Sequence, residues 1–128
     1  MPADDAVHLT MPAQTRHLRL ARLTAAGLAG DLGFDLEAIE DLRVAVDELC
    51  AAVIDDVPAH SRLALRYWVD GTTIRIDGEV DADGPAPQLH RVAEELLGIV
   101  ADEFAVDGGD GRRSFRLVKR GQRRDGGG

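Results

Sequence analysis

The sequence predicts an α+β fold, a two-layer sandwich in which helices cover one face of an antiparallel or mixed sheet. Between residues 18 and 57, apolar residues recur at intervals of three and four, which is the spacing of amphipathic helices. Between residues 63 and 80 they recur at every second position, which is the spacing of half-buried strands. Because each predicted helix has a single apolar stripe, the helices should bury that stripe against the sheet.

A strand and a helix are predicted near the N-terminus. Val7, Leu9 and Met11 alternate with other residues and indicate a short strand that ends at Pro12. A helix follows, and Gly33 is a favourable left-handed residue to end it. The apolar stripe of this helix is Leu18, Ala21, Ala25, Leu28 and Leu32.

The signals for a second helix are stronger. Asp35 is a good N-cap, and Phe34 and Ile39 occupy the two positions of a hydrophobic staple. The helix should run to about Val57, because Pro58 cannot continue it. Its inner stripe is Ile39, Leu42, Val46, Leu49 and Val53.

The second half of the chain is predicted to add four strands and one helix. These elements are strands over 63–69 and 74–80, a helix over 87–101, and strands near 103–106 and 113–120. Asp70-Gly71 is a hairpin turn signal, and loops fall at 81–87 and 107–111. We expect one domain over residues 1–120 and a flexible tail at 121–128. The stripe of the third helix is Leu89, Val92, Leu96 and Ile99.

Composition excludes several functional classes. The 128 residues have a formal net charge of −8, which disfavours direct nucleic-acid binding. The chain has one cysteine and no histidine pair with metal-ligand spacing, so no metal site is predicted. Neither a signal peptide nor an apolar run of membrane-spanning length is visible, and we expect a cytoplasmic protein.

Two charged features each allow two interpretations. Glu48 lies in an otherwise apolar stretch of the second helix, where a carboxylate is either a functional group or half of a solvent-facing acidic pair with Asp47. A basic cluster near the C-terminus is either a patch for an anionic partner or the charged face of a solvated strand. That cluster is Arg112, Arg113, Arg116, Lys119 and Arg120.

Three stretches of the chain resemble a known family. They are RLARLTAAGLAGDLGFDLEAIEDLRVAVDELCAAVI, GIVADEFAV and RRSFRLVKR. Together they resemble the bacterial anti-sigma-factor serine kinases of the histidine-kinase-like (GHKL) ATPases, and most closely the actinobacterial members. The resemblance implies the Bergerat ATP-binding fold, magnesium and ATP as cofactors, and frequent homodimers. The patch for a dimer contact would be Leu20 and Leu23.

The family's nucleotide motifs match this chain only in part. Glu48 matches the general base, but Ala52 stands where an asparagine holds magnesium, and a methyl group cannot coordinate a cation. Gly78 stands where an aspartate receives the adenine amino group. The glycines that should follow are Val80 and Ala82, and the glycine-rich lid is missing. Asp83 and Gly84 would form a displaced motif only if the strand contained a bulge.

The sequence therefore favours an anti-sigma-factor-like regulator that acts by protein–protein binding, with a degenerate ATP site and no required cofactor. Its partner would be a sigma factor or a STAS-type antagonist. In that case Glu48 should be structural, paired with an arginine of the sheet or capping amides after Val80, and its removal should cost stability. The alternative is an active serine kinase that uses Glu48 as base, with a metal held by water and by Asp47 or Asp83. A pocket that binds another small ligand is a third possibility.

Overall fold

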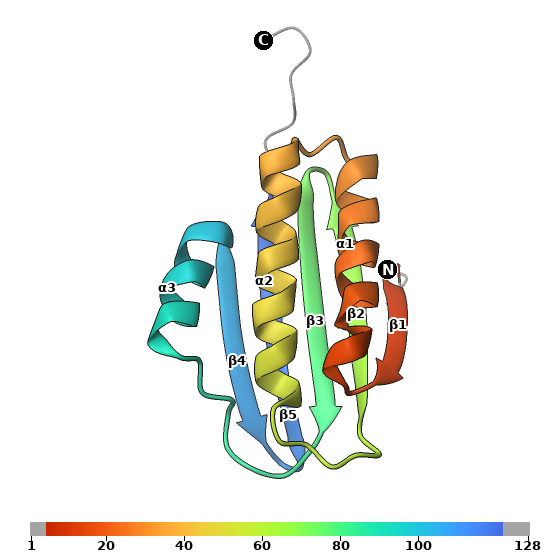
Figure 1. Cartoon of the computed structure of the whole chain (residues 1–128). Coiled ribbons are helices and arrows are strands. Elements are labelled where there is room, and N and C mark those ends of the chain that lie inside the picture. The colour runs from red at the N-terminus through yellow and green to blue at the C-terminus, as the bar shows by residue number, and fades with distance from the viewer. Residues whose placement is uncertain (1–4, 122–128) are drawn as a thin grey trace, which may run out of the picture.

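The computed structural model describes residues 5–121, which fold into a five-stranded sheet with all its helices on one face (Figure 1). The strands are β1 (Val7–Pro12), β2 (Arg62–Asp70), β3 (Thr73–Asp81), β4 (Glu103–Gly109) and β5 (Arg112–Arg120). The helices are η1 (Thr15–His17), α1 (Leu18–Asp31), α2 (Leu36–Ile54) and α3 (Arg91–Val100). The predicted two-layer α+β sandwich and its order of elements are confirmed.

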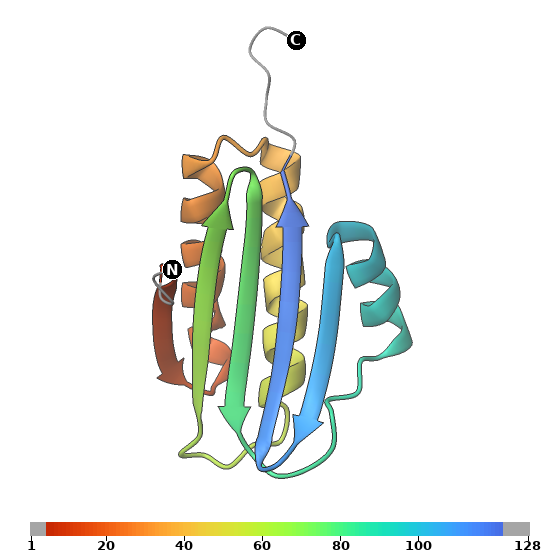
Figure 2. The ribbon, with the colours of Figure 1, turned by 180° about the vertical axis from the view of Figure 1, so that it is seen from behind.

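The sheet is antiparallel throughout, in the order β1-β2-β3-β5-β4. Seen from behind in Figure 2, its outer face is not covered by any helix. Strands β2 and β3 form the predicted hairpin, with Gly71 in the left-handed region at φ 62°. Side chains alternate between the two faces, so that Leu63, Leu65 and Tyr67 of β2 enter the core, whereas Val69 near the end of the strand is 42% exposed.

The core lies between the sheet and the two long helices. The predicted Asp35 N-cap of α2 is confirmed, because its carboxylate accepts a hydrogen bond from the Ala38 N–H at 2.8 Å. Gly33 ends α1 at φ 81°, and Phe34 is buried beside it. The fully buried stripe of α2 includes Leu42, Val46, Leu49 and Val53.

The prediction for the third helix was wrong in its start and its buried face. The chain from Pro87 to His90 is not helical, and α3 begins only at Arg91. Its buried residues are Leu97 and Val100, whereas Val92 and Ile99 are 74% and 78% exposed. The apolar residues of α3 lie around more of the helix circumference than one neighbouring element can cover. Their spacing alone therefore could not predict which of them are buried.

Smaller boundaries also differ. Helix α2 ends at Ile54 rather than near Val57, and the turn between β4 and β5 is shorter than predicted. The predicted tail lies outside the described residues except for Gly121, whose N–H donates to the Thr72 carbonyl at 2.8 Å. Within residues 5–121, no helix has the length and apolar character needed to cross a lipid bilayer.

Candidate functional site

Glu48 lies on the flank of α2 that faces α3 and β5. Its helical neighbour Asp47 points the other way, toward α1, where it pairs with Arg22 at 2.5 Å. Asp41, two turns before Glu48 on the same flank, lies 3.6 Å from Lys119 of β5. Lys119 in turn donates to the carbonyl of Val100 at the end of α3. Asp47 therefore belongs to the interface between α1 and α2. It does not face the same side of the helix as Glu48, where the kinase alternative would need it to hold a metal.

The Glu48 carboxylate itself is partly buried and makes no hydrogen bond or ion pair with another residue in the range 5–121. The expectation that it pairs with a sheet arginine or caps the loop amides is therefore wrong for this part of the chain. The physical reason is its partial exposure, because water can solvate a carboxylate that is not fully buried. Glu48 is the unpaired carboxylate of this flank.

Position 52 lies one helical turn beyond Glu48, and its alanine side chain has no donor or acceptor atom. The next polar contact along this flank comes from the sheet. Arg113 of β5 donates through Nη2 to the Asp55 carbonyl at 2.8 Å, just past the end of α2. Its Nε is buried and has no partner among the described residues. An arginine thus holds the C-terminal end of α2 against the sheet, a role that the sequence did not indicate.

Gly78 faces the helices from the middle of β3, and the space above it is filled. Gly78 is paired with Phe115 of the neighbouring strand β5. A Cβ built on Gly78 would lie 2.7 Å from Cζ of Phe115 and 3.0 Å from Cδ2 of Leu65. Real Cβ atoms essentially never approach another heavy atom within 3.0 Å. The predicted adenine position is therefore a packed part of the core. An aromatic ring beside a strand glycine was the missed signal, because such glycines often mark a close approach of other atoms.

The connection from β3 to α3 is held close to the β4–β5 hairpin. Ala82 N–H donates to the Gly111 carbonyl at 2.9 Å, and a Cβ on Gly108 would lie 2.5 Å from the carbonyl carbon of Pro85. Asp83 and Gly84 are exposed in this connection, outside the strand. Strand β3 pairs without interruption from residue 73 to 80 with β2 and from 73 to 81 with β5, so the bulge that a displaced motif requires is absent from this strand.

The basic cluster of β5 is divided between the two faces of the sheet. Arg112 and Arg116 are on the outer face, beside Glu79 at 3.4 Å and Asp77 at 3.4 Å. Arg113 and Lys119 are on the helix side, where each donates to a carbonyl. Because β5 lies between β3 and β4, it is not an edge strand. The five cations do not form one patch, since successive residues of a strand face opposite ways.

The outer face of the sheet carries a shallow polar hollow that the sequence did not indicate. Its volume is about 350 Å³. The guanidinium groups of Arg66 and Arg75 lie 5.4 and 4.6 Å from the ring centre of Trp68 on the same face. Arginine and acidic side chains alternate across the strands of this face and pair with one another. Such cross-strand pairs are ordinary on a solvent-exposed antiparallel sheet. The lining includes Ala64, Arg66, Asp77, Glu79, Ala105 and Ser114.

We expect Glu48→Ala to change the free energy of unfolding by less than about 0.5 kcal/mol, because the carboxylate has no partner to leave unpaired. Asp47→Ala is the matched control on the same turn. It removes the half-exposed pair with Arg22 and should cost up to about 1 kcal/mol. Urea unfolding of both variants measures the difference. If Glu48→Ala lost more stability than Asp47→Ala, the conclusion that the Glu48 carboxylate has no partner within residues 5–121 would be contradicted.

Cys50 lies at the core side of this helix, fully buried. Burial raises the pKa of its thiol well above the ordinary range, and the nearby negative charge of Asp47 raises it further. We expect iodoacetamide at pH 8 to leave Cys50 unmodified in the folded protein and to alkylate it in urea, as measured by mass spectrometry. Since the folded state holds the thiol proton more tightly, the contribution of Cys50 to stability should be constant below the ordinary thiol pKa of about 8.5 and fall as the pH rises above it.

An antiparallel sheet with its helices on one face defines the class of fold as a two-layer α+β sandwich. A solved structure shares this fold. The RsbU and RsbW domains of Rv1364c from Mycobacterium tuberculosis superpose with a TM-score of 0.70 at 17% sequence identity, covering 91% of this chain and 32% of that chain.

Sequence comparison identifies the family. The serine-protein kinase RsbW of Bacillus subtilis is 36% identical over 120 residues, covering 80% of this chain and 75% of that protein. The serine-protein kinase RsbW of Halalkalibacterium halodurans is 37% identical over 51 residues, about a third (32%) of its length. No family model matches the chain. The chain belongs to the family of RsbW serine-protein kinases.

Proposed function

We propose that this protein is an anti-sigma-factor-like regulator of transcription that acts by binding another protein, without phosphoryl transfer. The observation that carries the proposal is the packing of Phe115 and Leu65 over Gly78. A purine ring needs both a cavity and a polar group that reads its edge, and the helix-facing side of Gly78 is filled by two apolar side chains. Ala52 supplies no oxygen for magnesium.

The connection between β3 and α3 supports the same proposal. Phosphoryl transfer depends on groups that surround and position the phosphates. Here the connection is short, and Ala82 and Gly108 hold it against the β4–β5 hairpin. A segment fixed in this way leaves little chain to close over a nucleotide.

The partners would be a sigma factor or a STAS-type antagonist, and the complex would form without nucleotide. Self-association would use Leu23 of α1, which is 58% exposed. Leu20, on the same helix, packs partly against the core and contributes less apolar surface to such a contact.

A second candidate function is that of an active serine kinase, and the free Glu48 carboxylate favours it. In this reaction Glu48 would take the proton from a serine hydroxyl of the antagonist while the serine oxygen bonds to the γ-phosphorus and ADP leaves. The cofactors would be ATP and magnesium.

Titration calorimetry with Mg-ATP separates the two functions. For the regulator we expect no heat of binding up to millimolar ATP, together with a nucleotide-independent complex between the purified protein and a sigma factor or STAS protein. Micromolar ATP binding, or transfer of a labelled γ-phosphoryl group to a STAS serine, would establish the kinase instead. In that event Glu48→Gln should lower the rate by roughly 100-fold or more.

A further inference from the structure

Helix α3 has an apolar stripe that the core does not use. Val92 and Ile99 are 74% and 78% exposed, whereas Leu97 and Val100 on the adjacent face are buried. Leu96 packs partly against the core and lies between Val92 and Ile99 at helical spacing. These three residues, called here the α3 stripe, form one continuous apolar line on a helix at the β4 edge of the sheet (Figure 1).

The surroundings of the α3 stripe are acidic. Glu95 lies beside it on α3, exposed and only loosely paired with Arg91 at 3.4 Å. Asp102 and Glu103 follow shortly after the helix, where the Asp102 carboxylate accepts from the Arg120 N–H and Glu103 pairs with the Arg120 side chain. The neighbouring helix α2 contains five carboxylates and one arginine, and Glu48 on its α3-facing flank is unpaired within residues 5–121.

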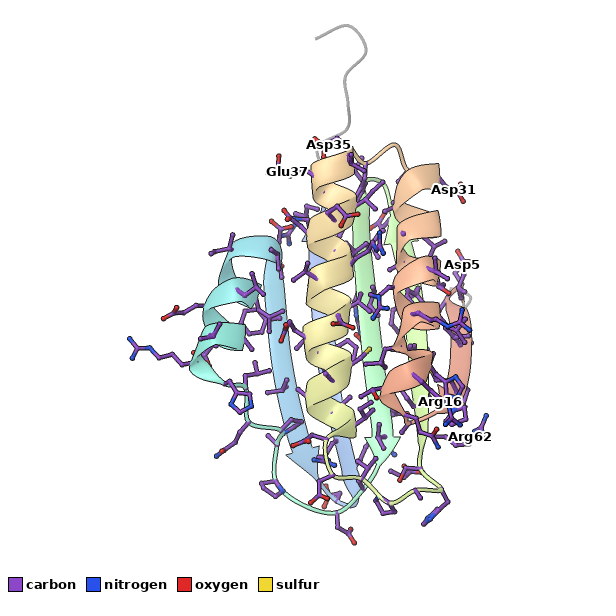
Figure 3. The ribbon with its side chains drawn as sticks, in the orientation of Figure 1. Asp5, Arg16, Asp31, Asp35, Glu37 and Arg62 are labelled. Carbon is purple, nitrogen blue, oxygen red and sulfur yellow. The ribbon has the colours of Figure 1, made fainter. Side chains whose placement is uncertain are left out.

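Two exposed cations lie near the α3 stripe, Arg91 on α3 and Arg120 beside Glu103, and each is paired with a carboxylate. Other exposed cations lie elsewhere on the molecule. Arg16 and Arg62 lie by the start of α1 and of β2, at the opposite edge of the sheet from α3 (Figure 3). Arg66 and Arg116 lie on the outer face of the sheet, beside Trp68 and Asp77. The α3 stripe therefore lies in a negative field.

This charge distribution narrows the range of partners. A second copy of the chain would bring two acidic borders together, and like charges in an interface are repulsive. Nucleic acids and anionic membrane surfaces are repelled for the same reason. A partner that buries the α3 stripe favourably has apolar residues flanked by Lys or Arg.

We propose that the α3 stripe is a docking surface for a basic amphipathic helix of a partner protein. Val92, Leu96 and Ile99 would pack against apolar residues of that helix, and Glu95 and Glu48 would face its cations. The proposal rests on the proposed function, because it names the surface by which the regulator would hold its partner.

Two synthetic peptides of about 18 residues test the proposal. Both have one leucine face, and the polar face is lysine in one and glutamate in the other. We expect the lysine peptide to bind the full chain in a fluorescence anisotropy titration and to shift the methyl NMR signals of Val92 and Ile99. The double variant Val92→Gln/Ile99→Gln should weaken binding about tenfold or more, because two apolar contacts are lost.

Leu36→Gln is the matched control, since it removes a leucine that is 75% exposed at the start of α2 and has no part in the α3 stripe. Binding should not change in this variant. Glu95→Lys should weaken the binding of the lysine peptide, because it reverses a charge beside the α3 stripe and leaves the apolar residues of the stripe unchanged. The absence of lysine-peptide binding at millimolar concentration, equal binding of the glutamate peptide, or an equal loss of binding in Leu36→Gln would overturn the proposal. A sigma-factor complex that is insensitive to the double variant would also overturn it without affecting the proposed function.

Discussion

Replacing Gly78 by aspartate should lower the free energy of unfolding by more than about 3 kcal/mol. The new Cβ would meet the ring of Phe115 and the Cδ2 atom of Leu65, and the carboxylate would be buried among apolar side chains. The substitution introduces the acidic residue of the family's adenine motif, yet we expect no gain in nucleotide affinity. Urea unfolding measures the first effect and calorimetry with Mg-ATP the second.

Gly27→Asp is the matched control for this experiment. A Cβ at Gly27 of α1 meets nothing within 4 Å, so aspartate should be tolerated there. The double variant Gly78→Asp/Phe115→Ala separates crowding from charge burial, because it removes the ring that occupies the space. We expect the two changes to be non-additive by more than about 1 kcal/mol. A Gly78→Asp protein as stable as the parent would contradict the packing described for this strand.

Gly108→Ala should cost about 1–3 kcal/mol and loosen the connection between β3 and α3. A methyl group at this position would lie 2.5 Å from the Pro85 carbonyl carbon and 2.6 Å from the Ala86 Cα, and backbone atoms cannot rotate away as a side chain can. Either the connection or the end of β4 must move. Hydrogen exchange at the Ala82 N–H, which donates to the Gly111 carbonyl, reports the displacement directly.

Ala105→Val is the control on the same strand, because Ala105 is exposed on the outer face and valine suits a strand. It should leave both the stability and the exchange of Ala82 nearly unchanged. Unaltered exchange at Ala82 in Gly108→Ala would show that the connection does not depend on this contact.

Much of the fold was predictable because its signals are local. The Asp35 cap, the left-handed Gly33 and the Asp70-Gly71 turn each act within a few residues, and each was found where expected. The buried face of α3 was not predictable. Its apolar residues allow more than one stripe to be buried, and the choice depends on where the helix meets α2 and the sheet edge, which are distant in sequence.

The candidate site was likewise predictable in part. The sequence could assign Glu48, Ala52 and Gly78 to positions on α2 and β3. It could not indicate that Phe115 fills the space over Gly78, because that contact requires the antiparallel register of β3 and β5. For Glu48, a partner was expected from the cost of burying a charge, but the helix leaves that residue partly exposed.

Gly78 and Phe115 also have an evolutionary consequence, because each makes the other necessary. An aspartate at position 78 would force the ring of Phe115 to shift and would weaken the core. Removing the phenylalanine alone leaves a hole in the core, at a typical cost of about 3–5 kcal/mol for Phe→Ala. Either single step therefore passes through a weakened protein, and a typical domain has only about 5–15 kcal/mol in reserve. A descendant of this chain would regain an acidic residue in the middle of β3 more readily by changing both positions together than by accumulating the two changes one at a time.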